Sequence, residues 1–378
     1  MHLFLRRPPA PDVRPEKGAG LGYPDRVTAE PFAGQDAPAG GLDALSVVIP
    51  VYNEETWVRR SVKALLEAAD AAGLSLDVVV VDDGSTDNTP AVLDELAARA
   101  GIVVHTQPNA GRLAARAAGL ALAREPWVLL LDSRVIIDRD ALRWLKQQLA
   151  DHPDRQVWCG HVDVDIDQNP YAAFWSGLVK IGWRRYTAKP RLVSFGTEEF
   201  DYYPKGTGCL VIRQGLLREA VGSFDSMFDN DQLSSDDTRL LRYVASKQRI
   251  WLSPDFAFRY HGKTGARGFV RQSYFRGTTF IDGYLGQPGV VRRALIAGLA
   301  VVAVFGVLTV RRPVIGAAGY AAGIVAIPSV VRLSGGSGYE VRSSAALAPA
   351  FIPVFGAGLL RGLTLAAVRA LRPRARTR

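Results

Sequence analysis

Short apolar runs alternate with amphipathic stretches along the first third of the chain. Residues 45–51, 76–81 and 127–131 are rich in Val, Leu and Ile, the pattern of parallel strands that are buried on both faces. Residues 54–72 and 86–100 carry apolar side chains at helical spacing, and the second stretch opens with capping residues followed by a proline. This order predicts an α/β fold with a doubly wound, mostly parallel sheet.

The alternation continues less regularly to residue 221. The further elements that we expect are a strand at 102–105, a helix at 111–124, strands at 156–165 and 207–213, and a helix at 215–221. Residues 171–186 are aromatic and basic. They predict either an amphipathic helix on a membrane surface or a helix whose aromatic side chains pack inside the second half of the domain.

The pattern changes near residue 290. Residues 294–310, 313–331 and 345–360 are apolar runs without a charged residue, and the first two approach the length of a membrane span. We therefore expect residues 290–378 to anchor the chain in a membrane. Arginines favour the cytoplasmic side, so two spans with a third segment that re-enters or lies in the interface would keep the basic C-terminal end in the cytosol.

Composition narrows the class of protein. The formal net charge is +9, and the basic residues cluster beside the apolar runs, which favours an anionic membrane surface over nucleic acid as the partner. The two cysteines, Cys159 and Cys209, form neither a metal-ligand spacing nor a disulfide framework, which fits a reducing cytosol. Residues 1–41 are rich in Pro, Gly and Asp and predict a mobile tail.

Polar side chains follow three of the predicted parallel strands. Because the carboxyl ends of such strands meet at one edge of the sheet, this edge is the expected nucleotide site. Tyr52 can stack on a base, and Glu54 can accept from a ring N–H or a ribose hydroxyl; the alternative is a polar turn. The residues that we assign to the donor here are Pro50, Tyr52, Glu54, Asp82, Asp83, Asp132, Ser133 and Arg134.

Two of these groups leave alternatives open. Asp82 and Asp83 are adjacent carboxylates that are costly to bury without partners; a nucleobase or ribose could supply these, or Asp83 could cap the following helix. Arg112 and Arg116 open the helix at 111–124. A helix N-terminus flanked by two arginines suits a diphosphate, and the alternative is a solvated basic face.

The order of these motifs over residues 45–282, with Asp236-Asp237 and His261 further on, resembles a family 2 glycosyltransferase with the GT-A fold. The resemblance implies a domain at 42–285, with a nucleotide-binding half at 42–135 and an acceptor half at 136–285. In that family the third strand usually ends Asp-X-Asp, whose acids hold Mg²⁺ or Mn²⁺ on the donor diphosphate. Here Arg134 stands at the second acid, so either Asp132 and His261 hold the metal or Arg134 supplies the positive charge itself.

The resemblance also assigns the acceptor side. Asp237 matches the general base that takes the proton of the acceptor hydroxyl, and Asp236 stands at the glutamate position before it; alternatively the pair complements a helix dipole. Thr207-Gly208 is similar to the small-residue turn beside the acceptor sugar. Gln272 and Arg276 resemble the family's Gln-X-X-Arg-Trp motif, one residue longer and with glycine for tryptophan, and imply contacts with the pyrophosphate and the acceptor.

We therefore expect an inverting glycosyltransferase of the hexosyltransferase class at the cell membrane. Its predicted partners are a nucleotide-diphosphate sugar, membrane lipids and a lipid-linked or glycan acceptor, with the catalytic domain in the cytosol and a role in cell-envelope glycan or glycolipid synthesis. The alternatives are a processive polysaccharide synthase and a catalytically dead membrane protein that binds sugar nucleotides as a scaffold.

Overall fold

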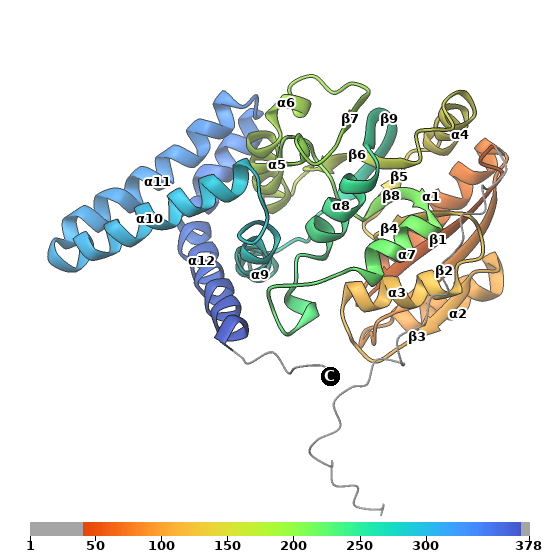
Figure 1. The fold of residues 1–378 in the computed structure, drawn as a ribbon, viewed down its shortest axis with the longest axis horizontal. Helices are drawn as coiled ribbons and strands as arrows, with labels where there is room; N and C mark the ends of the chain where they lie inside the picture. The colour runs from red at the N-terminus through yellow and green to blue at the C-terminus, as the bar shows by residue number, and fades with distance from the viewer. Residues whose placement is uncertain (1–40, 372–378) are drawn as a thin grey trace, which may run out of the picture. The chain divides into compact units, whose positions relative to one another are not determined.

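The computed structural model describes residues 41–371, so the tail predicted for residues 1–41 lies, but for Gly41, outside the described residues. Within them, nine strands form one mixed sheet in the order β3-β2-β1-β4-β8-β6-β9-β5, with β7 beside β9 (Figure 1). The strands are β1 Ala44–Val51, β2 Ser75–Asp82, β3 Val103–Thr106, β4 Trp127–Leu131, β5 Val135–Ile137, β6 Val157–Asp165, β7 Val193–Phe195, β8 Cys209–Arg213 and β9 Ile250–His261.

Helices lie between and after these strands. They are α1 Glu55–Ala72, α2 Thr89–Ala100, α3 Arg112–Leu122, α4 Ala141–Asp151, α5 Pro170–Gly182, α6 Arg184–Thr187, α7 Gln214–Gly222, α8 Asp236–Lys247, α9 Ala266–Tyr284, α10 Val290–Arg311, α11 Pro313–Leu333 and α12 Gly338–Leu371, with short 3₁₀ turns η1 Phe200–Tyr202 and η2 Asp231–Leu233. The helices predicted at 54–72, 86–100, 111–124 and 215–221 correspond to α1, α2, α3 and α7, and further helices lie between and after them.

The N-terminal half of the sheet is parallel, as the buried apolar runs predicted. Strand β1 pairs in parallel with β2 and β4, and β2 pairs with β3. Crossovers are right-handed, so α1 and α2 cover one face of the sheet and α3, which returns from β3 to β4, covers the other. The carboxyl ends of β1, β2 and β4 consequently meet at one edge. The predicted α/β fold with its doubly wound sheet is confirmed.

The other half of the sheet is mixed. Strand β8 is antiparallel to both β4 and β6, and β9 is parallel to β6 but antiparallel to β5 and β7. Strand β8 therefore brings the turn at Thr207 and Gly208 to the carboxyl end of β4. This antiparallel insertion joins the two halves of the domain at the edge where the polar loops lie.

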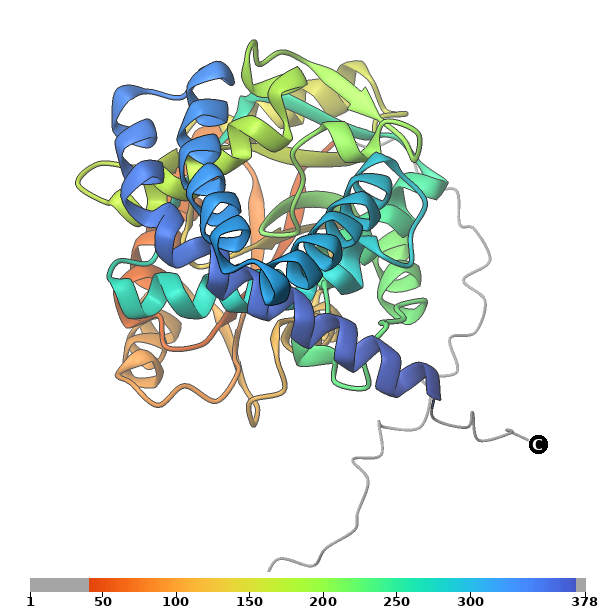
Figure 2. The same ribbon diagram turned by 90° about the vertical axis from the view of Figure 1, so that its left-hand side faces the viewer.

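Three C-terminal helices are long and apolar enough to cross a membrane. Helices α10 and α11 form a hairpin that extends to one side of the sheet and leaves most of its side chains exposed (Figures 1 and 2). Helix α12 has 34 residues, with Pro349 and Pro353 in its interior, and is far longer than the apolar run at 345–360. The described residues form one compact unit that includes these helices.

Helix α12 is joined to the domain through α5. The Glu340 carboxylate is fully buried and accepts from Ser176 Oγ at 2.6 Å and from Lys180 Nζ at 2.7 Å. Phe174 of α5 is buried and lies 4.8 Å from Phe351 of α12, measured between ring centroids. Phe174 also contacts Phe269 of α9 at 5.1 Å between ring centroids. The aromatic side chains of α5 therefore pack both against the second half of the domain and against α12.

Candidate active site

The loop after β1 is fastened to the loop after β2. Asn53 adopts a left-handed backbone conformation (φ 55°), its N–H donates to Ser85 Oγ at 3.0 Å, and its side-chain oxygen accepts from Thr86 N at 2.7 Å. Pro50 lies in β1 beside this loop. Tyr52 is 46% exposed, so its ring is accessible from solvent.

Asp82 and Asp83 are both buried, and the protein supplies partners for both. The Asp83 carboxylate accepts from Gln107 Nε2, Ala110 N and Gly111 N, each at 2.8 Å. Asp82 accepts from Ser85 N at 3.0 Å. Neither carboxylate caps the next helix. Asp83 instead fixes the loop that leads into α3, and its buried carboxylate is hydrogen-bonded without a nucleotide.

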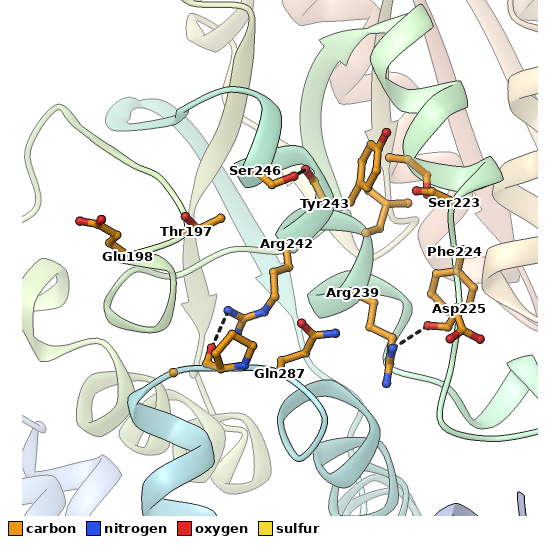
Figure 3. Close-up of a pocket in the computed structure, with 14 residues that line it drawn as sticks. Thr197, Glu198, Ser223, Phe224, Asp225, Arg239, Arg242, Tyr243, Ser246 and Gln287 are labelled. Carbon is orange, nitrogen blue, oxygen red and sulfur yellow. Dashed lines mark hydrogen bonds between the residues drawn. The ribbon is translucent and has the colours of Figure 1, made fainter. Parts of the chain in front are cut away.

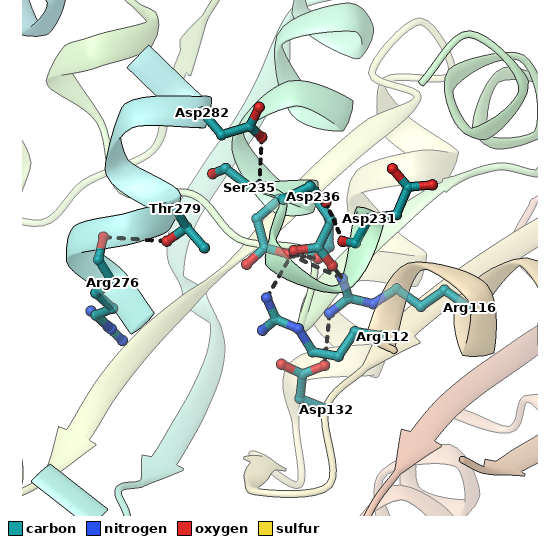
Figure 4. Close-up of polar contacts among 12 residues, drawn as sticks. Arg112, Arg116, Asp132, Asp231, Ser235, Asp236, Arg276, Thr279 and Asp282 are labelled. Atoms are coloured by element: carbon teal, nitrogen blue, oxygen red, sulfur yellow. Dashed lines mark hydrogen bonds and ion pairs between the residues drawn. The ribbon is translucent and has the colours of Figure 1, made fainter. Parts of the chain in front are cut away.

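Arg116 connects three carboxylates that lie far apart in the sequence (Figure 4). Its guanidinium is 2% exposed and donates to Asp132 at 2.9 Å, to Asp236 at 2.8 Å and to Asp237 at 3.0 Å. Arg112, one turn earlier on α3, donates to Asp236 at 2.8 Å. The structure thus brings the predicted donor arginines to the predicted acceptor acids, a pairing that spacing along the chain gave no means to predict.

The two adjacent acids at the start of α8 have opposite electrostatic properties. Burial raises the pKa of the Asp236 carboxyl and outweighs the attraction of Arg112 and Arg116. Burial would also raise the pKa of Asp237, but Arg112, Arg116 and the hydrogen bond from Thr207 outweigh it and bring this pKa to about 2. Asp237 keeps 35% of its side chain exposed. It is therefore an ionised carboxylate that a substrate can reach.

The turn before β8 completes this cluster. Thr207 is buried and its hydroxyl donates to the Asp237 carboxylate. The carbonyl of Gly208 accepts from Asp132 N at 3.0 Å. A Cβ at Gly208 would lie 2.7 Å from Asp132 Oδ2, so a glycine is required for Asp132 to sit there. The predicted acceptor turn thus lies against both the donor and the acceptor carboxylates.

Arg134 points toward the loop after β1. Its Nε lies 2.8 Å from the Glu54 carboxylate, and its guanidinium lies over the Trp57 ring at 5.6 Å. Ser133, between it and Asp132, is buried. Among the described residues no acceptor takes a hydrogen bond from the two terminal nitrogens of Arg134. Both nitrogens therefore remain available to an anion.

His261 pairs with Asp165. Its Nδ1 is 2.8 Å from Asp165 Oδ2, its ring stacks on Trp57 at 4.4 Å, and its backbone N–H donates to the Arg134 carbonyl at 2.9 Å. Burial lowers the pKa of His261 despite the nearby Asp165. Within residues 41–371 no group of three or more His, Cys, Asp or Glu side chains could hold a metal ion. With Asp132 already paired to Arg116, the donor set expected for Mg²⁺ or Mn²⁺ is not assembled.

Helix α9 carries Gln272, which is half-buried, and Arg276. The Arg276 guanidinium lies 4.3 Å from the centroid of the Trp175 ring, and burial lowers its pKa. Figure 4 shows Arg276 on the side of the cluster toward α9. In the described part of the chain this guanidinium has no hydrogen-bond acceptor or carboxylate partner. It is a second cation that an anionic substrate could use.

A pocket of about 680 Å³ lies on another face of α8 (Figure 3). Its lining includes Arg239, Arg242 and Tyr243, but neither Asp236 nor Asp237. Arg242 forms an ion pair with Asp201 at 3.1 Å and donates to the Pro288 carbonyl at 3.2 Å. These arginines, which the sequence gave no reason to single out, hold the acceptor half together rather than face the acid cluster.

Comparison with known proteins identifies the domain. The profile of the family described as "Glycosyl transferase family 2" matches residues 46–212. This part of the chain belongs to glycosyl transferase family 2. The predicted resemblance is therefore confirmed. Arg112, Arg116 and Asp132 lie within the matched residues, and Asp236 and Asp237 follow them in the chain.

Two relatives that match part of the chain have names that include a polyprenyl phosphate. A dodecaprenyl-phosphate galacturonate synthase of Rhizobium johnstonii is 36% identical over 114 residues, covering 28% of this chain and 32% of the relative. An undecaprenyl-phosphate 4-deoxy-4-formamido-L-arabinose transferase of Pseudomonas aeruginosa is 40% identical over 153 residues, which cover 39% of this chain and 43% of the relative. The chain thus spans less than half the length of these relatives.

A solved mannosyltransferase of Pyrobaculum calidifontis, in complex with GDP-mannose and Mn²⁺, is also similar. It is 18% identical, with a TM-score of 0.47, over 86% of each chain.

Proposed function

We propose that this protein is a membrane-bound inverting glycosyltransferase that moves a sugar from a nucleotide-diphosphate sugar to a lipid-linked acceptor in cell-envelope glycan synthesis. The observation that carries the proposal is the position of Asp237. It is a partly exposed, ionised carboxylate that shares Arg116 with Asp132, which lies in the part of the chain that matches family 2. The polyprenyl-phosphate relatives and the three apolar helices support a lipid-linked acceptor.

The proposed chemistry is a single displacement. The acceptor hydroxyl attacks the anomeric carbon as Asp237 takes its proton, and the bond to the diphosphate breaks on the opposite face. The nucleoside diphosphate leaves with the bonding electrons. Arg134 and Arg276, whose terminal nitrogens have no acceptor within residues 41–371, would stabilise the charge that develops on it. Tyr52 would stack on the base.

The acceptor would approach from the side of the C-terminal helices. Helix α9, which carries Gln272 and Arg276, is packed along α12. A lipid chain in the membrane beside α12 would therefore bring its polar end toward the acid cluster. We place the catalytic domain on the cytosolic face, where nucleotide sugars are made.

The test is transfer by the purified full-length chain in lipid nanodiscs. UDP-, GDP- and dTDP-sugars are each offered with a polyprenyl phosphate and, separately, with a bacterial lipid extract. We expect one donor to release its nucleoside diphosphate together with a new glycolipid seen by mass spectrometry. If no nucleotide sugar is turned over, the proposal is wrong. Binding without turnover would then favour the scaffold that binds sugar nucleotides.

Replacement of Arg134 tests how the diphosphate is held. We expect wild-type protein to bind its nucleoside diphosphate with similar affinity in EDTA and in Mn²⁺, because the metal donor set is not assembled. Charge-assisted hydrogen bonds contribute about 1.5–3 kcal/mol, so Arg134→Ala should weaken binding by roughly 10- to 100-fold in both conditions. Arg134→Asp should bind only when Mn²⁺ is present.

The measurement is calorimetric titration of UDP, GDP and dTDP against each variant. Arg139→Ala, at an exposed arginine on the following segment, is the matched control and should bind as wild type does. A wild type that binds only with Mn²⁺, or equal affinity in Arg134→Ala and wild type, would exclude the proposed arginine role.

A further inference from the structure

Asp282 on α9 is a buried carboxylate that the proposed chemistry does not use. It is fully buried. One oxygen accepts from Ser226 Oγ at 3.0 Å and from Met227 N at 2.6 Å; the other accepts from Ser235 N at 2.7 Å and pairs with Arg239 Nε at 3.0 Å. All four donors belong to the segment that leads into α8 or to the first turn of α8. One carboxylate thus fixes both ends of this segment.

Asp282 holds the residue that comes directly before the two acids. Ser235 is the last residue before α8, and Asp236-Asp237 follow at once. Figure 4 shows the contact between Asp282 and Ser235 beside the acid cluster. At the next position a Cβ on Gly283 would lie 2.7 Å from Ser235 Oγ. Helix α9 and the start of α8 are therefore in direct contact, and a shift of α9 would displace Asp237.

The end of α12 holds the same segment from another direction. Arg369 donates to the carbonyls of Ser226 and Phe228, the latter at 2.7 Å, and pairs with Asp225 at 2.8 Å. Phe228 is buried among side chains of α9, α10 and α12, including Ile281. Residues 225–235, which we call the acid-leading segment, are thus held between Asp282 and Arg369.

Helices α9 and α12 are themselves joined backbone to backbone. A Cβ on Gly277 would collide with the Phe355 carbonyl, and one on Gly358 with the Tyr274 carbonyl. A Cβ on Gly362 would lie 2.7 Å from the Thr278 carbonyl. Glycines that let helix backbones touch are typical of tight helix pairs in membranes. The apolar helix α12, α9 and the acid-leading segment consequently behave as one packed unit.

We propose that Asp282 and Arg369 are positioning residues that set the place of Asp237, so that α12 is part of the catalytic architecture as well as a membrane anchor. The proposal rests on the proposed role of Asp237. A displaced acid-leading segment would move the base away from the acceptor, while the donor contacts at β1, β2 and Arg134 stay in place. Turnover should therefore fall without loss of nucleotide binding.

The test compares full-length Arg369→Gln, Arg369→Lys and Asp282→Asn with wild type in nanodiscs. Arg361→Gln is the matched control, because Arg361 also lies on α12 but its guanidinium lies over Tyr274, at 5.4 Å from the ring centroid. Hydrogen exchange should become about tenfold faster in residues 226–239 of Arg369→Gln and Asp282→Asn only. Their kcat should fall at least tenfold with affinity for the nucleoside diphosphate within twofold, and Arg369→Lys should recover part of the loss.

Several outcomes would overturn the proposal. Unchanged exchange in residues 226–239, or faster exchange with wild-type kcat, would show that neither residue positions the base. Faster exchange across the whole domain would indicate a general loss of stability. In that case the proposal is wrong if Arg369→Lys restores the stability of the domain but not the kcat. A wild type without transfer would count against the proposed function, whereas the exchange comparison would still decide whether Asp282 and Arg369 hold the segment.

Discussion

The kcat of the Asp237→Asn variant is expected to be about 10²- to 10⁴-fold lower than that of wild type, because this is the usual contribution of a general base to the rate. The amide keeps the shape of the side chain, so contacts with Thr207 and the position of α8 should change little. Affinity for the nucleoside diphosphate should stay close to that of wild type, because the donor contacts lie at Arg134 and the strand ends. Steady-state transfer and calorimetric titration on the same preparation measure both quantities.

The low pKa of Asp237 has a consequence for the pH dependence of the rate. Arg112 and Arg116 hold its pKa at about 2, so the carboxylate is ionised throughout the neutral range and its own titration should not limit the rate there. A carboxylate of such low pKa is a weak base, and its action depends on placement next to the acceptor hydroxyl. Near-wild-type turnover in Asp237→Asn would exclude Asp237 as the general base.

Arg116→Met is expected to lower the free energy of unfolding by about 3–5 kcal/mol, the cost of leaving buried charges without their partner. Arg116 joins Asp132, Asp236 and Asp237 and is itself 2% exposed. Met fills similar volume but leaves three carboxylates facing one another. Denaturant unfolding in detergent, followed by tryptophan fluorescence, measures the loss.

Arg112→Met is the matched control, since this side chain is 47% exposed and, within residues 41–371, forms its ion pair with Asp236; its cost should be clearly smaller. The wild-type advantage should also depend on pH. In wild type the pKa of Asp237 lies below its ordinary 3.8, at about 2, so its stabilising contribution is complete above 3.8 and is lost as pH falls toward 2. A stability gap that does not narrow over this pH window, or equal losses in the two variants, would contradict this role of Arg116.

Much of this architecture could be predicted from the sequence because its signals are local. A buried strand and an amphipathic helix each need apolar residues at a fixed period, and this period located β1, β2, β4, α1 and α3. The strand ends could be placed at one edge because parallel strands share a direction. Family resemblance then singled out Asp132 and Asp237, and the apolar runs indicated the membrane helices.

Contacts between distant residues were beyond such reasoning. The sequence suggested that Arg112 and Arg116 bind a diphosphate and that His261 joins Asp132; the structure pairs the arginines with Asp236 and places His261 against Asp165 and Trp57. The sequence around a charged residue does not indicate which opposite charge it will pair with, because the pairing depends on how separate elements pack together.

The same reason applies to the C-terminal helix. Hydropathy identified an apolar run at 345–360, but only the packed structure extends α12 over Gly338–Leu371 and joins it to Asp225 through Arg369. The sequence by itself determined which segments are strands, helices and apolar spans, since these follow from the order of side chains along the chain. Only tertiary packing decided which charges meet. Charged residues that are far apart in the sequence become partners when the folded elements bury them together, and no local pattern specifies this.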